Sequence, residues 1–191
     1  MRKTSFGTFA VLFAAVALMG CSTSPRSTEQ RANLRDEGMT SVKEMERTDV
    51  GLEDFLNKAY GYTIFPSVGK GGAIVGGAYG KGVVYEKGQW IGYADLSQAT
   101  VGLQLGGQTY SELIAFETRE ALDRFKNNQL AFSANASAVA LKSGASTAAK
   151  YTDGVAVFTA AKGGLMFEAS IGGQKFTFVP RENAGPAKEG Q

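Results

Sequence analysis

Few side chains in this sequence are of the types that carry out catalysis. The 191 residues include no histidine and a single cysteine, Cys21. A Ser-His-Asp triad, a Cys-His pair, a two-histidine zinc site and an imidazole proton relay are therefore excluded. Four carboxylates remain as acid-base candidates, but their spacing marks no two as partners: Asp95, Glu112, Glu117 and Asp123. Solvated surface is the default expectation for all four, and we predict no catalytic residue, no metal and no cofactor.

A glycine-rich block invites comparison with nucleotide-binding loops. The chain has 25 glycines, and 13 of them fall within residues 61–107. Residues 76–81 are one residue short of a phosphate-binding loop, and Gly82 stands where that loop needs a serine or threonine to hold magnesium. No Gly-x-Gly-x-x-Gly run occurs either. The sequence therefore gives no support for a nucleotide site.

One short pattern occurs twice and carries positive charge. Residues 65–72 and 158–164 both begin with phenylalanine and end in Lys-Gly-Gly, which places Lys70 and Lys162 at corresponding turns. Lys81 follows on the strand after the first turn. One interpretation is a cationic site for anionic lipid headgroups formed by these three lysines. The other is a pair of glycine turns with exposed lysines. The pattern leaves both open.

The charge balance limits the partners that the chain can attract. The formal net charge is +2, from 20 basic and 18 acidic residues, and two of the basic residues, Arg2 and Lys3, lie in the first few positions. Without them the count is 18 against 18. Binding to a phosphate backbone needs a clustered basic surplus, because affinity comes from releasing counterions. Nucleic acid is therefore not an expected partner.

The first twenty residues have the composition of an export signal. A basic start, residues 1–3, precedes an apolar stretch at residues 6–18, which is shorter than the roughly 20 residues of a spanning helix. The next residues, Leu18-Met19-Gly20-Cys21, resemble a bacterial lipobox. That resemblance implies cleavage before Cys21, a diacylglyceryl group on its sulfur and a further acyl chain such as palmitate on its amine. Several acyl chains anchor stably where one does not. By the same analogy, Ser22 favours the periplasmic side of the outer membrane.

Hydrophobic periodicity predicts three helices. Residues 22–27 have no apolar pattern and are expected to form a flexible tether. Residues 29–47 place a thin apolar stripe on one helical face, a second short helix should stop near Gly61, and Thr118 is positioned to cap a third that closes at Asn127 and Asn128. The residues expected to pack are, in chain order, Leu34, Gly38, Val42 and Met45; Leu52, Phe55, Leu56 and Ala59; and Ala121, Leu122 and Phe125.

Period-two alternation predicts strands between and after the helices. In residues 73–85 the bulkier side chains and Lys81 point one way, while Gly76, Ala78, Gly80 and Gly82 point the other. A nearly bare face allows another backbone, a helix or a ligand to approach closely. Residues 101–105 and 165–171 alternate in the same way. We predict an α+β fold: a Gly-rich, largely antiparallel, curled and barrel-like sheet with a few flanking helices.

The order of several motifs resembles that of SYLF domains. The matching segments are residues 59–68, 70–72, 79–84, 88–90, 101–108 and 163–173. The resemblance implies a module that binds lipid surfaces, since eukaryotic members bind phosphoinositides and, in yeast, actin filaments. We therefore expect a signal peptide at residues 1–20, a tether and N-terminal helix at 21–50, a SYLF-like domain at 51–181 and a flexible tail at 182–191.

Two functions follow as hypotheses. The leading one is a non-enzymatic lipoprotein, anchored through Cys21, whose SYLF-like domain contacts membrane phospholipid. The anchor already holds the domain at the bilayer, so weak contacts suffice. The alternative is a protein-interaction or structural module of the cell envelope, with an envelope protein as its partner and incidental lipid binding. A sheet with exposed edges suits docking by strand addition.

Overall fold

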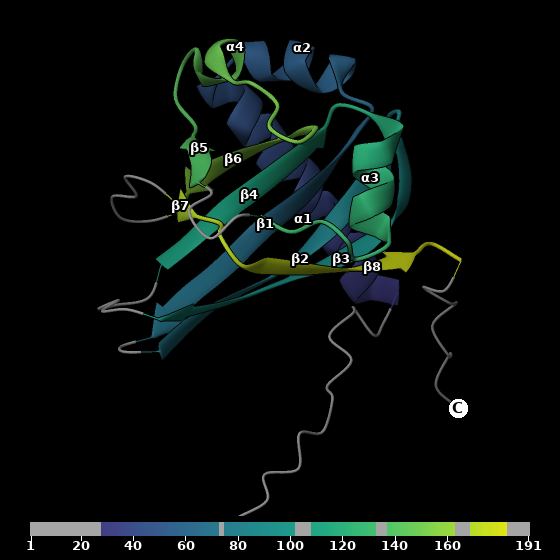
Figure 1. Ribbon diagram of the computed structural model, residues 1–191. Coiled ribbons are helices and arrows are strands. Elements are labelled where there is room, and N and C mark those ends of the chain that lie inside the picture. Colours follow the sequence, from purple (N-terminus) through teal and green to yellow (C-terminus); the bar gives the residue numbers. More distant parts are fainter. Residues whose placement is uncertain (1–27, 73–74, 102–107, 133–136, 163–168, 183–191) are drawn as a thin grey trace, which may run out of the picture.

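The fold is an eight-stranded sheet with helices on both of its faces (Figure 1). The computed structural model describes residues 28–72, 75–101, 108–132, 137–162 and 169–182. In chain order the elements are α1 (Thr28–Thr48), α2 (Gly51–Lys58), β1 (Gly61–Gly72), β2 (Val75–Glu86), β3 (Gln89–Val101), β4 (Gln108–Phe116), α3 (Arg119–Lys126), β5 (Ser137–Ala140), α4 (Ala145–Ala148), β6 (Val155–Ala161), β7 (Ala169–Ser170) and β8 (Gln174–Pro180).

The sheet is largely antiparallel, as predicted, but it is open. Its strand order is β7-β5-β6-β4-β1-β2-β3-β8, and only β5 and β6 run parallel. The two edge strands, β7 and β8, are separated along the chain by residues 171–173, yet no ladder joins them within the described residues. β7 contributes two residues, and both of them pair with β5. Two residues are too few for β7 to close the sheet into a barrel. The expected barrel-like closure is therefore wrong.

The three predicted helices are confirmed. α1 buries Leu34, Gly38, Val42 and Met45, the stripe expected from the sequence. α2 buries Leu52 and Leu56. α3 buries Ala121, Leu122 and Phe125, and the Ala121 N–H donates to the Thr118 hydroxyl at 3.3 Å, the predicted N-terminal cap. Asn128 follows in the left-handed conformation (φ 58°), which ends the helix.

The sheet separates two hydrophobic cores. On one face lie α1 and α2, which pack on Ile64, Val83 and Leu113. On the other face α3 and the loop after it cover Phe65, Ile114 and Val157, inside the curl of the sheet. Figure 1 shows α1 behind the strands and α3 in front of them. We call the two sides the α1 face and the α3 face.

The small-residue face of β2 is also confirmed, and its neighbour is a strand. Gly80 and Gly82 lie on the α3 face, where a Cβ atom on Gly82 would stand 2.6 Å from Phe65 Cδ1 and one on Gly80 would stand 2.9 Å from Val68 Cγ2. Bulky side chains of β1 therefore occupy the space that these glycines leave. The close approach that the sequence allowed is cross-strand packing.

Some expectations fall outside the described residues. These include the leader and Cys21, Leu103 and Leu105, Leu165 and Phe167, the second Lys-Gly-Gly turn beyond Lys162, and most of the tail. The sequence analysis did not predict α4, whereas the long strand expected at residues 73–85 corresponds to β2. No helix of the described segments is long and apolar enough to cross a membrane.

Candidate functional site

The three lysines expected to form a site lie on different faces of the sheet. Lys70 and Lys162 do flank the start of β4, since Lys70 pairs with Gln108 and the Lys162 N–H donates to the Thr109 carbonyl at 3.0 Å. The alternation of β1 places Lys70 on the α3 face with Val68. Lys81 lies on the α1 face, where it borders a hollow with Gln30 and Glu37. The structure therefore does not bring Lys81 to the same surface as Lys70.

Lys81 also has a carboxylate beside it. It pairs with Asp95 of β3, and the Tyr79 hydroxyl donates to Asp95 Oδ1 at 3.3 Å. Directly paired residues share a face with Cβ atoms about 5 Å apart, so a negative charge lies beside Lys81 on this face. The α1 face at this point is a mixed polar surface.

A second basic surface, which the sequence did not predict, surrounds the single tryptophan. The guanidinium carbons of Arg35 and Arg181 lie 4.5 and 5.0 Å from the Trp90 ring centroid. The Tyr93 ring packs edge-on against Trp90 at 5.4 Å, and the indole N–H donates to the Gly92 carbonyl at 2.9 Å. These contacts fix an aromatic platform between two cations. We call Arg35, Trp90, Tyr93 and Arg181 the Trp90 patch.

The Trp90 patch joins parts of the chain that are distant in sequence. Arg35 comes from α1, Trp90 and Tyr93 from β3, and Arg181 from the residue after β8. No ion pair within the described part of the chain involves Arg35 or Arg181. Guanidinium groups bind phosphate in a bidentate manner, and tryptophan is favoured where an apolar surface meets water. Tyr93 is only 2% exposed, so it supports the indole from the core side and makes no part of the exposed surface. The patch therefore has the chemistry of a phospholipid headgroup contact.

A pocket of about 420 Å³ opens on the other side of the sheet. It lies along β6, whose pairing with β5 within the described residues is limited to Phe158 and Thr159. Its apolar wall is formed by Leu130, Phe132, Val139, Val155, Val157 and Ile171. We call it the α3 pocket. Its volume lies in the usual range of roughly 300–1,000 Å³ for small-molecule sites.

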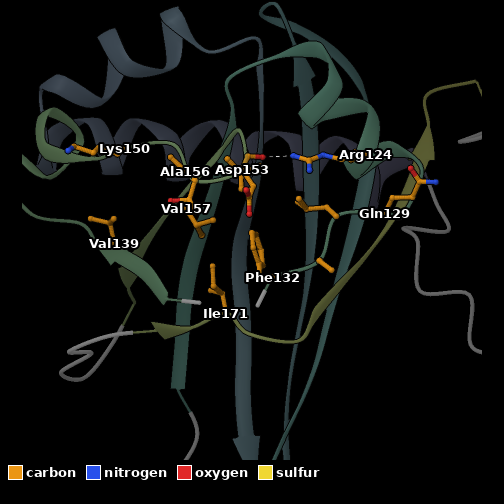
Figure 2. Close-up of a pocket in the computed structure, with 13 residues that line it drawn as sticks. Arg124, Gln129, Phe132, Val139, Lys150, Asp153, Ala156, Val157 and Ile171 are labelled. Carbon is orange, nitrogen blue, oxygen red and sulfur yellow. Dashed lines mark hydrogen bonds between the residues drawn. The ribbon is translucent and has the colours of Figure 1, made fainter. Parts of the chain in front are cut away.

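Charged side chains line one margin of the α3 pocket. Figure 2 shows Lys150, Asp153 and Arg124 in a row along one side, with Val139, Ile171 and Phe132 along the other. The Arg124 guanidinium donates to the Asp153 backbone carbonyl. Asp153 and Gly154 form a two-residue turn with positive φ angles, closed by hydrogen bonds between Thr152 and Val155. This turn fixes the position of Arg124.

A buried carboxylate lies deeper inside the curl of the sheet. Glu112 of β4 is fully buried and accepts a hydrogen bond at 2.9 Å from the Gln174 amide of β8. It is paired with Thr159 of β6, and Gln174 is paired with Gln98 of β3. Glu112 Oε1, Gln174 Oε1 and Thr159 Oγ1 find no hydrogen-bond partner among the described residues. A polar layer thus crosses the interior of the α3 face.

This environment shifts the titration of Glu112. Burial raises its pKa to about 7, against opposing effects from Gln174, the Tyr110 hydroxyl and the charge of Lys70. Burial and the nearby Glu112 charge in turn raise the pKa of Tyr110. The expectation that Glu112 is solvated surface is therefore wrong. Asp95, Glu117 and Asp123 are partly or fully exposed, and no group of three potential metal ligands occurs among the residues described.

Two local sequence patterns could have predicted the burial of Glu112 and the turn at the margin of the α3 pocket. Glu112 is followed by the apolar run Leu113-Ile114-Ala115-Phe116, which indicates a strand buried on both faces. Asp153-Gly154 before Val155 is a strong hairpin-turn signal. The Trp90 patch has no equivalent signal, because its members come together only through the fold.

Comparison with known protein families finds a match for the C-terminal half of the chain. Residues 97–185 match the sequence model of a family described as Ysc84, Las17-binding protein actin regulator. The match includes every residue of the α3 pocket and Glu112. The chain is also 31% identical over 122 residues to Beta cell expansion factor A of Aeromonas veronii, an alignment that covers 63% of this chain and 46% of the relative. The chain thus spans about half the length of that relative.

Proposed function

We propose that this chain, whose residues 97–185 belong to the Ysc84 (SYLF) family, is a non-enzymatic envelope protein that is anchored by lipid at Cys21 and binds phospholipid surfaces. The Trp90 patch is the observation that carries the proposal. Each basic side chain near an anionic bilayer contributes about 1 kcal/mol, and an interfacial tryptophan adds apolar contact. Actin regulation, which the family description names, requires a cytoskeletal partner that a protein held on the periplasmic side of the envelope, as proposed, does not meet.

The position of the patch agrees with the proposed anchor. Arg35 lies two turns into α1, which begins at Thr28. Six residues lie between Cys21 and Thr28, so the seven Cα–Cα steps of this tether reach at most about 25 Å. An acylated Cys21 would therefore keep the start of α1, and the Trp90 patch beside it, close to the membrane. The high local concentration makes a weak headgroup contact sufficient.

The alternative membrane-contact surface, formed by Lys70 and Lys162, lies at the other end of the strands from the Trp90 patch. Lys70 is level with Ala78 and Gln98, whereas Trp90 is level with Tyr85 and Tyr62. Eight residues of β1 separate the two levels, about 26 Å at 3.3 Å per residue. A flat bilayer that contacts one end leaves the other in solvent. Membrane contact through Lys70 and Lys162 is thus a separate proposal from contact through the Trp90 patch.

Vesicle binding of the chain from residue 28 onward separates these proposals, because any affinity then belongs to the domain. With vesicles that contain phosphatidylglycerol, replacing Arg35 and Arg181 together by glutamine should weaken binding about thirtyfold, or about 2 kcal/mol. The loss should shrink as salt is raised, because charges are screened over about 10 Å at 0.1 M.

Matched charge removals complete this experiment. Lys58 and Lys142, both exposed, lie on or beside α2 and α4, away from the start of α1, and their double glutamine variant should bind like wild type. The Lys70→Gln, Lys162→Gln variant tests the lysine surface. If it loses affinity and the arginine variant does not, the membrane-facing end is the opposite one. If neither variant loses affinity, the protein-interaction alternative becomes the better proposal.

A further inference from the structure

We propose that the α3 pocket binds the acyl chain of a single-chain amphiphile, with an anionic headgroup held at Arg124. The inference deepens the proposed function and rests on it, since it needs lipid around the protein. It names a second kind of contact: a single lipid molecule within the fold, in addition to a bilayer outside it. The headgroup chemistry is shared by a fatty-acid carboxylate and a lysophospholipid phosphate.

The apolar wall of the pocket is suited to a hydrocarbon chain. Val155, Val157, Leu130 and Ile171 are buried at its base, and Phe132 is half-buried beside them. Val139 of β5, which lines the pocket at the edge of the sheet, is 38% exposed and is one of four large apolar side chains exposed on the described surface. Covering such surface is favourable by about 25 cal/mol per Å². An apolar ligand gains that free energy without displacing a structural hydrogen bond from the wall.

The charged margin selects the headgroup. Arg124 and Lys150 carry two positive charges, and the Asp153 carboxylate carries one negative charge between them. Figure 2 shows Lys150 at the far end of the row and Arg124 with its guanidinium directed to the Asp153 turn. Arg124 uses one guanidinium nitrogen to donate to the Asp153 carbonyl. No ion pair within the described part of the chain engages its other N–H groups. The margin therefore favours an anion over a neutral or cationic group.

The pocket and the Trp90 patch can be tested separately. The pocket lies mainly on the α3 face, whereas Arg35 belongs to α1 and Trp90 packs against the core of the α1 face. Substitutions in the patch should therefore lower vesicle binding and leave the pocket unchanged. Loss of one property does not imply loss of the other.

The test uses the full chain in membranes with photoactivatable lipids. Three probes carry the same diazirine-bearing acyl chain: a fatty acid, a lysophosphatidylglycerol and a neutral monoacylglycerol. We expect the two anionic probes to label peptides that contain Phe132, Val139 and Val157. Val139→Trp, which adds bulk to the pocket lining at a partly exposed position, should reduce that labelling at least fivefold. Val50→Trp, at a residue 85% exposed on another part of the surface, is the matched control and should not.

A separate variant tests whether the pocket prefers anionic headgroups. Arg124→Gln should reduce labelling by the anionic probes at least threefold and leave the monoacylglycerol unchanged, while Arg119→Gln on the same helix has no effect. Comparison of the fatty acid with the lysophospholipid identifies the preferred headgroup. Labelling that is unaffected by either pocket variant, or that is not enriched at the pocket, overturns the proposal. Arg124 is exposed, so its variant decides the matter even if Val139→Trp folds poorly. Arg35→Gln with Arg181→Gln should leave pocket labelling intact, whatever it does to vesicle binding.

Discussion

At the scale of single residues, the burial of Glu112 determines its chemistry. A buried ionised carboxylate is costly unless it is fully hydrogen-bonded, and the described residues supply one clear donor, the Gln174 amide. Protonation removes the charge and adds a donor, which can satisfy one of the buried oxygens that otherwise lack a partner. The interior of the curled sheet therefore favours the neutral acid.

This preference predicts how stability depends on pH. Because the pKa of Glu112 is about 7 in the fold and about 4.5 when solvated, the folded chain binds the proton more tightly than the unfolded chain. The contribution of Glu112 is most favourable below about pH 4.5, declines as pH rises from 4.5 to 7, and changes little above that. A shift of this size corresponds to about 3 kcal/mol.

Urea unfolding between pH 4.5 and 8.5 checks this expectation. Glu112→Gln removes the titration while keeping the shape, so its free energy of unfolding relative to wild type should increase with pH and reach up to about 3 kcal/mol at pH 8. Glu117→Gln, an exposed carboxylate nearby in the chain, is the control and should follow the wild-type curve. A constant difference between Glu112→Gln and wild type across this range would contradict the proposed burial cost.

At the scale of elements, β1 and β2 fit together through residue size. The glycines of β2 on the α3 face lie against Phe65 and Val68 of β1, and both of these side chains are fully buried. Close-packed interiors accept added atoms only by shifting side chains or backbone. The glycine content of this hairpin is thus explained by packing at Gly80 and Gly82, and needs no ligand there.

Substitution by the smallest larger residue tests this packing. Gly82→Ala would place a Cβ atom 2.6 Å from Phe65 Cδ1 and 2.9 Å from the Ile64 carbonyl, so we expect a loss of about 1 to 3 kcal/mol in the free energy of unfolding. Gly80→Val should lose a similar amount. Gly69→Ala on β1 is the control, because its Cβ atom would meet nothing within 4 Å. Equal melting temperatures for all three variants would show that β1 can move aside.

The buried side chain of Asp49 joins three helices at one end of the fold. The Asp49 carboxylate accepts backbone N–H groups from Ser146 at 2.6 Å, Gly51 at 3.2 Å and Gly144 at 3.3 Å. Burial alone would raise the pKa of Asp49, but the hydrogen bonds lower it below its usual value. The carboxylate thereby ties the junction of α1 and α2 to the start of α4, an element that has no hydrophobic pattern of its own.

At the scale of the whole molecule, the sheet separates the two surfaces that we propose to contact lipid. The Trp90 patch is beside the start of α1, and the α3 pocket is on the opposite side of the sheet. Without residues 1–20 the chain has 18 basic and 18 acidic residues, so attraction of that part to a membrane depends on these local groups and on the proposed anchor. The anchor is thus the largest single determinant of location in this proposal.

The anchor is checked in cells. Wild-type protein should partition with membranes and carry an N-terminal mass increase of acyl size on Cys21, since several acyl chains hold a protein stably in a bilayer. Cys21→Ser should give an unprocessed or released protein. Ser22→Ala, next to the cysteine, is the control and should be processed normally. Recovery of mature protein with an unmodified Cys21 thiol would contradict lipidation.

The sequence alone determined the features that depend on residues close together in the chain. The apolar stripes of α1, α2 and α3, the Thr118 cap and the alternation of β2 all depend on residues within one or two turns of helix or one strand, so they could be predicted before the fold was known. The absence of histidine excluded catalytic and metal sites that need an imidazole, and the balance of charge made nucleic acid an unexpected partner, for the same reason: composition does not depend on folding.

Tertiary structure decided the features that depend on pairing between distant strands. Glu112 is buried because β6, β1 and β8 enclose it, and Arg35, Trp90 and Arg181 meet because α1, β3 and the end of β8 converge. The α3 pocket lies where the described pairing of β5 with β6 is limited to two residue pairs, and among the described residues the sheet stays open because β7 pairs with β5 and not with β8. Strand order and register are set by non-local packing, so no periodicity within one segment could have given them.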